Sequence, residues 1–328
     1  MQVFSAAATR QALTFERLIP ALRAMFAAGC SVPPRQVLEI AAPGGGRLTS
    51  LIMPAWQEGR CFGVKTINIA PGNAARGLPG LHASYILYDA NTGVPLALID
   101  GDEITTRRTA AASVLAAGWL ARADAGHLLV VGAGRVARLL PDAYRVVRPI
   151  DRVTVWARSV AQAEALADEL RVRGIAAAAA RDLEAAVGAA DIVSCATLAT
   201  EPLIRGEWLR DGTHLDLIGS FTPTMREADD GCFRGASIYV DTEEAWHKSG
   251  ELIGPMSRGV FAASDVRGTL ARLCRGEATA RTAARERTVF KSVGTALEDL
   301  AAAVLVFESG ALQSAAGPRA GGTSASTE

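Results

Sequence analysis

Residues 127–137 have the sequence HLLVVGAGRVA, an apolar strand followed at once by a glycine-rich turn. Gly132, Gly134 and Ala137 have the G-x-G-x-x-A spacing of dinucleotide-binding loops. The first glycine of such a loop permits a tight turn, the second lets the backbone approach a pyrophosphate, and the small third residue lets a helix pack on the strand. The sequence therefore predicts cofactor contacts at five positions: Gly132, Gly134, Arg135, Val136 and Ala137.

The sequence after this loop alternates short apolar strands with helical stretches. We expect a helix over 135–147, with its N-terminus at the phosphate, and a second helix over 161–172. The alternation predicts βαβ units in a doubly wound, parallel sheet, an α/β Rossmann domain. Beyond Asp265 the chain is expected to be helical. The expected strands after the first are VTVWA (153–157), IVSCA (192–196), HLDLIG (214–219) and SIYVD (237–241).

The first 125 residues show a different, mixed α and β pattern. A helix is expected over 16–28, and the segments 84–88 and 94–99 flank a turn-rich stretch typical of a hairpin, which indicates an antiparallel sheet. A further helix is expected to begin near Thr105, a plausible N-cap. The other expected strands are 50–53 and 61–69.

The chain has 328 residues, a length that favours two domains. We expect a first domain over 1–122 and a Rossmann domain over 123–290. The apolar stretch 291–312 is predicted to be a C-terminal helix that returns to the first domain, which makes that domain discontinuous. Residues 313–328, rich in Gly, Ser, Ala and Thr, are predicted to be a disordered tail.

Composition argues for a small-molecule partner. Lys and Arg number 34 and Asp and Glu number 34, so the basic surface of a nucleic-acid binder is not expected. The cysteines and histidines show no metal-ligand spacing, which argues against a metal. The absence of a leader pattern or a long apolar run predicts a cytoplasmic protein without membrane contact.

The end of the expected strand 153–157 bears on the choice of cofactor. It continues as Ala157-Arg158-Ser159, without the acidic residue that accepts hydrogen bonds from an adenosine ribose. An arginine and a hydroxyl suit a 2′-phosphate, so Arg158 and Ser159 favour NADP(H), with NAD(H) possible. The alternative is that Arg158 is a solvated surface residue.

Three cationic side chains are candidates for substrate chemistry. Lys65, one of only three lysines, lies in the apolar strand CFGVKTINI, where partial burial would lower its pKa and make it a proton donor or base. Arg108 is expected in the first turn of the helix capped by Thr105, where dipole and guanidinium together suit a carboxylate. Arg35 follows a double proline and offers a second contact. The alternative for each arginine is an ion pair at the protein surface. The alternative for Lys65 is a lysine at a strand edge that discourages aggregation.

Segments around these residues resemble the ornithine cyclodeaminase and mu-crystallin family over roughly 30–308. The resemblance implies a discontinuous α+β substrate-binding and dimerisation domain beside the Rossmann domain, and amino- or imino-acid chemistry between them. It implies that Arg35 and Arg108 hold the substrate carboxylate, that Lys65 contacts the substrate, and that Ala196 and Thr197 contact the cofactor. The matching segments are VPPR (32–35), FGVKTINIAPGN (62–73), LYDANTGVPLALIDG (87–101), DGDEITTRRTAAAS (100–113), CATLATEP (195–202), IGSFTPTMRE (218–227) and VDTEEAWHKSGEL (240–252).

Two departures from the cyclodeaminase pattern bear on the reaction. Phe221 stands where cyclodeaminases carry an aspartate, and Leu51 stands where they carry a glutamate. Reduction of a cyclic imine needs fewer proton transfers than deamination, because hydride adds to an electrophilic carbon once the pair is oriented. The sequence therefore favours reduction of pyrroline-2-carboxylate or piperideine-2-carboxylate to proline or pipecolate, as in the ketimine and pyrroline-2-carboxylate reductase branch. Ornithine cyclodeamination, alanine-dehydrogenase-like activity and a non-catalytic, crystallin-like role stay open as alternatives.

Overall fold

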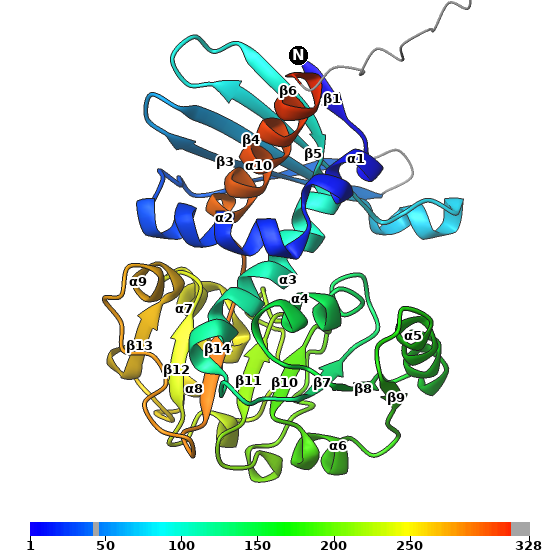
Figure 1. Cartoon of the computed structure of the whole chain (residues 1–328), viewed down its shortest axis with the longest axis vertical. Coiled ribbons are helices and arrows are strands. Elements are labelled where there is room, and N and C mark those ends of the chain that lie inside the picture. Colours follow the sequence, from blue (N-terminus) through cyan, green and yellow to red (C-terminus); the bar gives the residue numbers. More distant parts are fainter. Residues whose placement is uncertain (42–45, 316–328) are drawn as a thin grey trace, which may run out of the picture.

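The computed structural model describes residues 1–41 and 46–315, which form two β-sheets with helices packed around them (Figure 1). The larger sheet has eight parallel strands in the order β13-β12-β14-β11-β10-β7-β8-β9. Its central strands are buried along their whole length, as expected of a parallel sheet covered on both faces. Its strands are β7 (His127–Val131), β8 (Arg152–Trp156), β9 (Ala177–Ala179), β10 (Ile192–Cys195), β11 (His214–Leu217), β12 (Ser237–Val240), β13 (Val266–Thr269) and β14 (Thr288–Lys291).

The predicted doubly wound parallel sheet is confirmed, with two additions after Asp265. β13 and β14 are strands in a region expected to be helical, and β14 lies between β11 and β12. Each has only four residues, which is too short a segment for the periodicity of its side chains to distinguish a strand from a helix. The helices around this sheet are α4 (Leu140–Val147), α5 (Val160–Val172), α6 (Leu183–Ala189), α7 (Ala245–Lys248), α8 (Gly250–Ser257) and α9 (Leu270–Cys274).

The smaller sheet has six strands in the order β1-β6-β5-β4-β3-β2. It is antiparallel, as predicted, except that β1 pairs parallel with β6. The expected hairpin joins β5 and β6, and the Asp89 carboxylate fixes its turn by accepting from the backbone N–H groups of Asn91 and Thr92. The strands are β1 (Gln2–Phe4), β2 (Gln36–Ala41), β3 (Arg47–Gln57), β4 (Cys61–Ile69), β5 (Leu81–Asp89) and β6 (Pro95–Asp100).

One face of the smaller sheet is covered by helices. α10 (Ala296–Ala315) crosses this face beside α2 (Phe15–Ala28), and α3 (Gly101–Leu120) descends from this sheet toward the larger one (Figure 1). α10 follows β14 directly, so the last helix returns to the first sheet, as predicted. A short α1 (Ala6–Ala12) precedes α2. The predicted disordered tail began at residue 313, but the helix continues to Ala315, and 316–328 lie outside the described residues.

The start of α3 differs from the sequence prediction. Asp100 is the N-cap, because its backbone is extended and its carboxylate accepts from Glu103 N at 2.8 Å. The hydroxyl of Thr105 instead donates to Gly101 O inside the helix. A Cβ at Gly101 would lie 2.6 Å from the backbone of Ala83, so only glycine lets α3 begin this close to β5.

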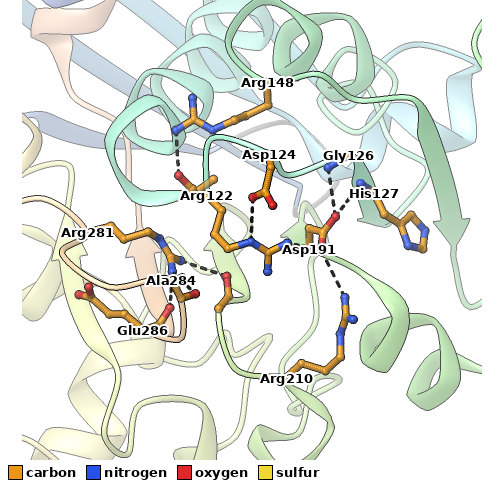
Figure 2. A network of polar contacts seen from close by, with 12 residues as sticks. Arg122, Asp124, Gly126, His127, Arg148, Asp191, Arg210, Arg281, Ala284 and Glu286 are labelled. Carbon is orange, nitrogen blue, oxygen red and sulfur yellow. Dashed lines mark hydrogen bonds and ion pairs between the residues drawn. The ribbon is translucent and has the colours of Figure 1, made fainter.

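Arginines of the larger-sheet region hold the C-terminus of α3 (Figure 2). Arg148, which follows α4, donates to the carbonyl oxygens of Ala117, Gly118 and Ala121, each at 2.8 Å. Arg281 donates to Leu120 O at 2.6 Å. A cation is favourable at the carbonyl end of a helix, so these contacts join the two sheets through α3.

A second part of this network fixes the chain between α3 and β7. Asp191 accepts from Arg122 at 2.8 Å and from the backbone N–H groups of Gly126 and His127 at 3.1 and 3.0 Å (Figure 2). Arg210 approaches the same carboxylate at 3.4 Å. The contacts hold β7, and with it the glycine-rich loop at its far end, relative to α3.

We expect Arg148→Ala to lower the free energy of unfolding by about 2–3 kcal/mol, since it removes charge-assisted hydrogen bonds to three helix carbonyls. The measurement is urea denaturation followed by circular dichroism. Arg145→Ala is the matched control, because Arg145 lies on α4, is exposed, and has a side chain that makes no hydrogen bond or ion pair with the described residues. Equal effects of the two substitutions would contradict a stabilising role for the α3 contacts.

Candidate active site

The glycine-rich loop lies where the strand order of the larger sheet reverses. β7 is flanked by β8 and β10, and ligands of doubly wound sheets bind in the crevice at this point, beyond the carboxyl ends of the strands. Gly132 has a φ of 118°, and a Cβ there would lie 2.7 Å from Ala196 O, so the position requires glycine. The loop after β7 and the loop after β10, with Ala196 and Thr197, are therefore in contact.

The helix after this loop begins later than expected. Residues 135–139 form turns, and α4 begins at Leu140 rather than at Arg135. Ala137 is fully buried, as its small size suggested, whereas Gly134 has open space around it. Arg135 donates to Thr106 Oγ1 at 3.0 Å and lies 3.6 Å from the Asp102 carboxylate, so its side chain connects the loop to α3.

The end of β8 leads directly into α5. Ser159 is the N-cap of α5 and its hydroxyl accepts from Gln162 N. Arg158 is exposed, and no hydrogen bond or ion pair is seen for it within the described part of the chain. No carboxylate lies in the segment 157–159, so nothing there repels an additional phosphate.

Glu227 ties together two loops at the same edge of the larger sheet. Its buried carboxylate accepts from Thr197 N at 2.7 Å and Thr197 Oγ1 at 2.8 Å, and from Gly219 N at 2.7 Å. Burial is the main cause that raises its pKa to about 8. Thr197 follows β10 and Gly219 follows β11, so this contact fixes the loops beside Gly132. Phe221, in the second of these loops, is 47% exposed.

A buried cluster of charges connects β4, α3 and α10. Lys65 Nζ lies 2.6 Å from Asp299 Oδ2, and both side chains are fully buried. Arg108 Nε lies 2.9 Å from Asp299 Oδ1, and Arg108 Nη1 donates to Glu298 Oε2 at 2.5 Å. Asp299 therefore lies between the two cations that the sequence selected, and Lys65 is more deeply buried than predicted.

Burial perturbs each group in this cluster. It lowers the pKa of Lys65 to about 8, against the opposing attraction of Asp299. Burial also raises the pKa of Glu298 to about 7, while Arg108 acts in the opposite direction. Burial disfavours the charge of Arg108 too, but Asp299 and Glu298 outweigh it and keep the pKa of Arg108 above its ordinary value. Lys65 is therefore able to gain or lose a proton near neutral pH.

The expected position of Arg108 in the first turn of its helix is wrong. Since α3 begins at Gly101, Arg108 lies two turns inside the helix, and the helix N-terminus does not assist it. Its environment comes from the carboxylates of α10 instead. Glu298 and Asp299 were missed, although two adjacent acids in the apolar stretch 291–312 were a visible signal of a buried partner.

Arg35 lies near this cluster, but no contact between them is seen in the described part of the chain. It is half-buried and lines a cavity of about 10 Å³, together with Met53 and Gly294. Gly294 touches Arg108, because a Cβ there would overlap the guanidinium. Arg35 and Arg108 therefore approach the same short segment from different sides. The rest of the cavity lining is Val32, Pro33, Glu244, Lys248, Thr295 and Ala296.

A larger cavity, of about 540 Å³, lies elsewhere, between β1, α1 and the end of α10. No ionisable side chain lines it, so it lacks the groups that acid–base chemistry or carboxylate binding requires. The candidate site is therefore the charge cluster and the adjoining crevice. Within 1–41 and 46–315, no group of three His, Cys, Asp or Glu side chains is arranged to hold a metal ion, and no helix is long and apolar enough to cross a membrane.

Residues 3–313 match the sequence pattern of the Ornithine cyclodeaminase/mu-crystallin family. The chain belongs to this family. It is 45% identical to the Δ1-pyrroline-2-carboxylate reductase of Paracoccus denitrificans, over 83% of this chain and 86% of the relative. The resemblance drawn from the sequence motifs is thereby confirmed.

Two solved structures superpose closely on this chain, in agreement with its assignment to the family. The Δ1-pyrroline-2-carboxylate reductase of Thermococcus litoralis, solved with NADH and L-proline, superposes with a TM-score of 0.89 at 32% identity, covering 96% of this chain and 98% of that chain. An archaeal alanine dehydrogenase dimer with bound NAD has a TM-score of 0.87 at 30% identity, covering 96% and 97%. The predicted pairing of a Rossmann sheet with a separate mixed-sheet domain is confirmed.

Proposed function

We propose that the chain is an NAD(P)H-dependent reductase that converts Δ1-pyrroline-2-carboxylate to proline. The observation that carries the proposal is the buried pair of cations, Lys65 and Arg108, in a chain similar to enzymes named for this reaction. Piperideine-2-carboxylate, with one more ring carbon, is the second candidate substrate. The prediction of an imino-acid reductase from the sequence agrees with the names of these relatives.

In this proposal the cofactor lies across the reversal point of the larger sheet. Gly132 and Gly134 bring the backbone to the pyrophosphate, with Arg135, Val136 and Ala137 completing the loop. Ala196 and Thr197 line the opposite side, where Glu227 fixes Thr197. When bound, the nicotinamide supplies hydride to the carbon of the C=N bond.

The chain's own residues bind and orient the substrate and handle its proton. Arg108 and Arg35 hold the carboxylate, since a planar guanidinium makes paired hydrogen bonds to it. Protonation of the imine nitrogen makes the carbon of the C=N bond electrophilic, and Lys65, with a pKa near 8, holds a proton that it can supply to that nitrogen. We assign residues 1–122 and 291–312 to the substrate-binding domain and 123–290 to the cofactor-binding domain.

The alternatives differ in the groups that they require. Ornithine cyclodeamination requires an acid at the positions of Phe221 and Leu51, and neither residue can accept a proton. Alanine-dehydrogenase-like activity is the other enzymatic candidate, because one similar structure carries that name. A non-catalytic, crystallin-like role makes no use of a buried lysine with a lowered pKa.

We expect reduction of Δ1-pyrroline-2-carboxylate to exceed deamination of ornithine by roughly 100-fold or more, since the missing carboxylate would act as a general base. Reductase turnover is measured as NADPH oxidation and deamination as ammonia release, with reductive amination of pyruvate assayed in parallel. Ammonia from ornithine without imine reduction would contradict the proposal.

Two variants separate the expected roles in the same assay. Arg108→Ala should mainly raise KM, whereas Lys65→Ala should mainly lower kcat and remove an ionisation near pH 8 from the rate profile. Lys65→Arg controls for the loss of charge alone.

We also propose that NADPH binds more tightly than NADH. Arg158 is exposed and no carboxylate lies in the segment 157–159, so it is available for a 2′-phosphate, whereas the two similar solved structures hold NADH and NAD. Arg158→Ala should weaken NADPH binding by about 5- to 150-fold, the equivalent of about 1–3 kcal/mol for a charge-assisted contact, and leave NADH unchanged. Fluorescence titration measures both affinities, with Arg145→Ala as control. Equal weakening of both cofactors would overturn the assignment.

A homodimer through the smaller sheet is the third proposal. Along the strands of the smaller sheet, buried residues alternate with half-exposed residues, which form an apolar face on the side of the sheet away from α10. The edge strand β2 also exposes Val37, Leu38 and Ile40. One similar structure is a dimer. The outward positions are Ile52, Pro54, Trp56, Phe62, Val64, Ile86, Tyr88, Leu96 and Leu98.

Light scattering at micromolar concentration should therefore give the mass of a dimer. Val64→Asp should shift it toward the monomer, because a charge on this face has no partner across the interface. Val172→Asp, at an exposed position on α5, is the matched control. A monomeric wild-type chain would contradict this proposal and leave the reductase proposal intact.

A further inference from the structure

Two carboxylates of the protein itself occupy Arg108, the residue proposed to bind the substrate carboxylate. Glu298 contacts Nη1 and Asp299 contacts Nε, and all three side chains are at most 8% exposed. A substrate carboxylate placed on Arg108 would therefore be a third anion at one buried guanidinium. Such an excess of like charge is costly in a site shielded from water.

The charged groups around Glu298 show the size of this excess. Arg108 of α3 and Lys65 of β4 are the cations, and Asp299 of α10 and Asp241, which follows β12, are the other anions. Lys291 acts on Asp241 as well, but it is shared with three further buried carboxylates, Glu227, Glu251 and Asp216. Arg35 is only half-buried and is not seen to contact Glu298 or Asp299 in the described part of the chain, so another carboxylate on Arg108 favours neutralisation of one that is already there.

Of the three carboxylates of Glu298, Asp299 and Asp241, that of Glu298 has the fewest hydrogen bonds and ion pairs to offset its negative charge. Its Oε1 has no hydrogen-bond partner among the described residues, and its Oε2 contacts only Arg108. Asp299, by contrast, lies within 2.9 Å of both cations. Asp241 accepts from the backbone N–H groups of Thr242, Val293 and Gly294, each at 2.7 Å. A proton is therefore least costly on Glu298.

We propose that binding of the substrate carboxylate at Arg108 is coupled to the uptake of one proton by Glu298. The proton neutralises Glu298 and frees Nη1 of Arg108 for the incoming carboxylate, so the number of anions around the two cations stays constant. Glu298 is thus a positioning residue that acts through Arg108. The inference rests on the proposed carboxylate site but not on the identity of the ring or of the cofactor.

The direction of the pH dependence follows from burial. Burial raises the pKa of Glu298 to about 7, and a further anion close by raises it again. At pH 8 the group is therefore mostly ionised in the free protein and protonated in the complex. Affinity for a carboxylate ligand should be constant at low pH and should fall as the pH rises above 7, by up to roughly ten-fold per pH unit.

Pyrrole-2-carboxylate is a suitable probe, because it carries the carboxylate on a planar five-membered ring whose nitrogen is not basic. Any proton taken up on binding then belongs to the protein. Titration calorimetry of the NADPH-saturated, full-length protein at pH 8, in phosphate and in Tris, gives the number of protons from the difference in heat. The wild type should take up close to one proton per site.

Two variants test the assignment to Glu298. Glu298→Gln keeps an oxygen acceptor for Arg108 but cannot be protonated, so proton uptake on probe binding should be smaller than in the wild type by close to one proton per site. Any uptake that remains belongs to Lys65, whose pKa lies near 8. Glu308→Gln, the same change at an exposed position of α10, should behave as the wild type.

Three outcomes would overturn the inference. They are probe binding by the wild type without proton uptake, uptake in Glu298→Gln that equals that of the wild type, and wild-type affinity that does not fall above pH 7. The second outcome is measured on Glu298→Gln and the third on the wild type. The inference can therefore be rejected even if the variant does not fold. Failure here with normal imine reduction leaves the proposed function standing, whereas absence of both probe binding and imine reduction rejects both.

Discussion

The buried ionic contact of Asp299 with Lys65 and Arg108 is the constraint on which this molecule depends. It joins β4, α3 and α10, three elements far apart in the sequence, at a point shielded from water. Charges in such a place are tolerated only when paired, and removal of one partner from a buried pair typically costs about 3–5 kcal/mol. The return of α10 to the first sheet is therefore required both by packing and by the charges of Lys65 and Arg108.

The same contact places the chemistry beside the cofactor crevice. α3 carries Arg108 in its middle, contacts Arg135 of the glycine-rich loop near its start, and is held by Arg148 and Arg281 at its end. One helix thus fixes Arg108, the proposed carboxylate-binding group, relative to the reversal point of the larger sheet. Orientation of this kind supplies most of what hydride addition to an imine demands from a protein.

Sequence reasoning recovered the elements whose signals are local. The glycine turn at 132–134, the hairpin of β5 and β6 and the strand around Lys65 have their own composition and spacing, and all three formed as expected, whereas the helix after the turn begins at Leu140 rather than at Arg135. It failed where the deciding contact is distant or the segment is short. Thr105 was predicted to be the N-cap of α3, but the N-cap is Asp100. The helix begins there because Gly101 packs closely against β5, a contact that the local sequence does not reveal. Asp299 looked like one acid in an apolar helix, since its partners lie about 190 and 230 residues earlier.

The most direct test of this account is a crystal structure of the protein with NADP⁺ and L-proline. The account predicts that the proline carboxylate contacts Arg108, that its nitrogen lies beside Lys65, and that its Cα faces the nicotinamide across the crevice next to Gly132 and Thr197. A complex with proline bound elsewhere, and with Arg108 still paired only with Glu298 and Asp299, would contradict it.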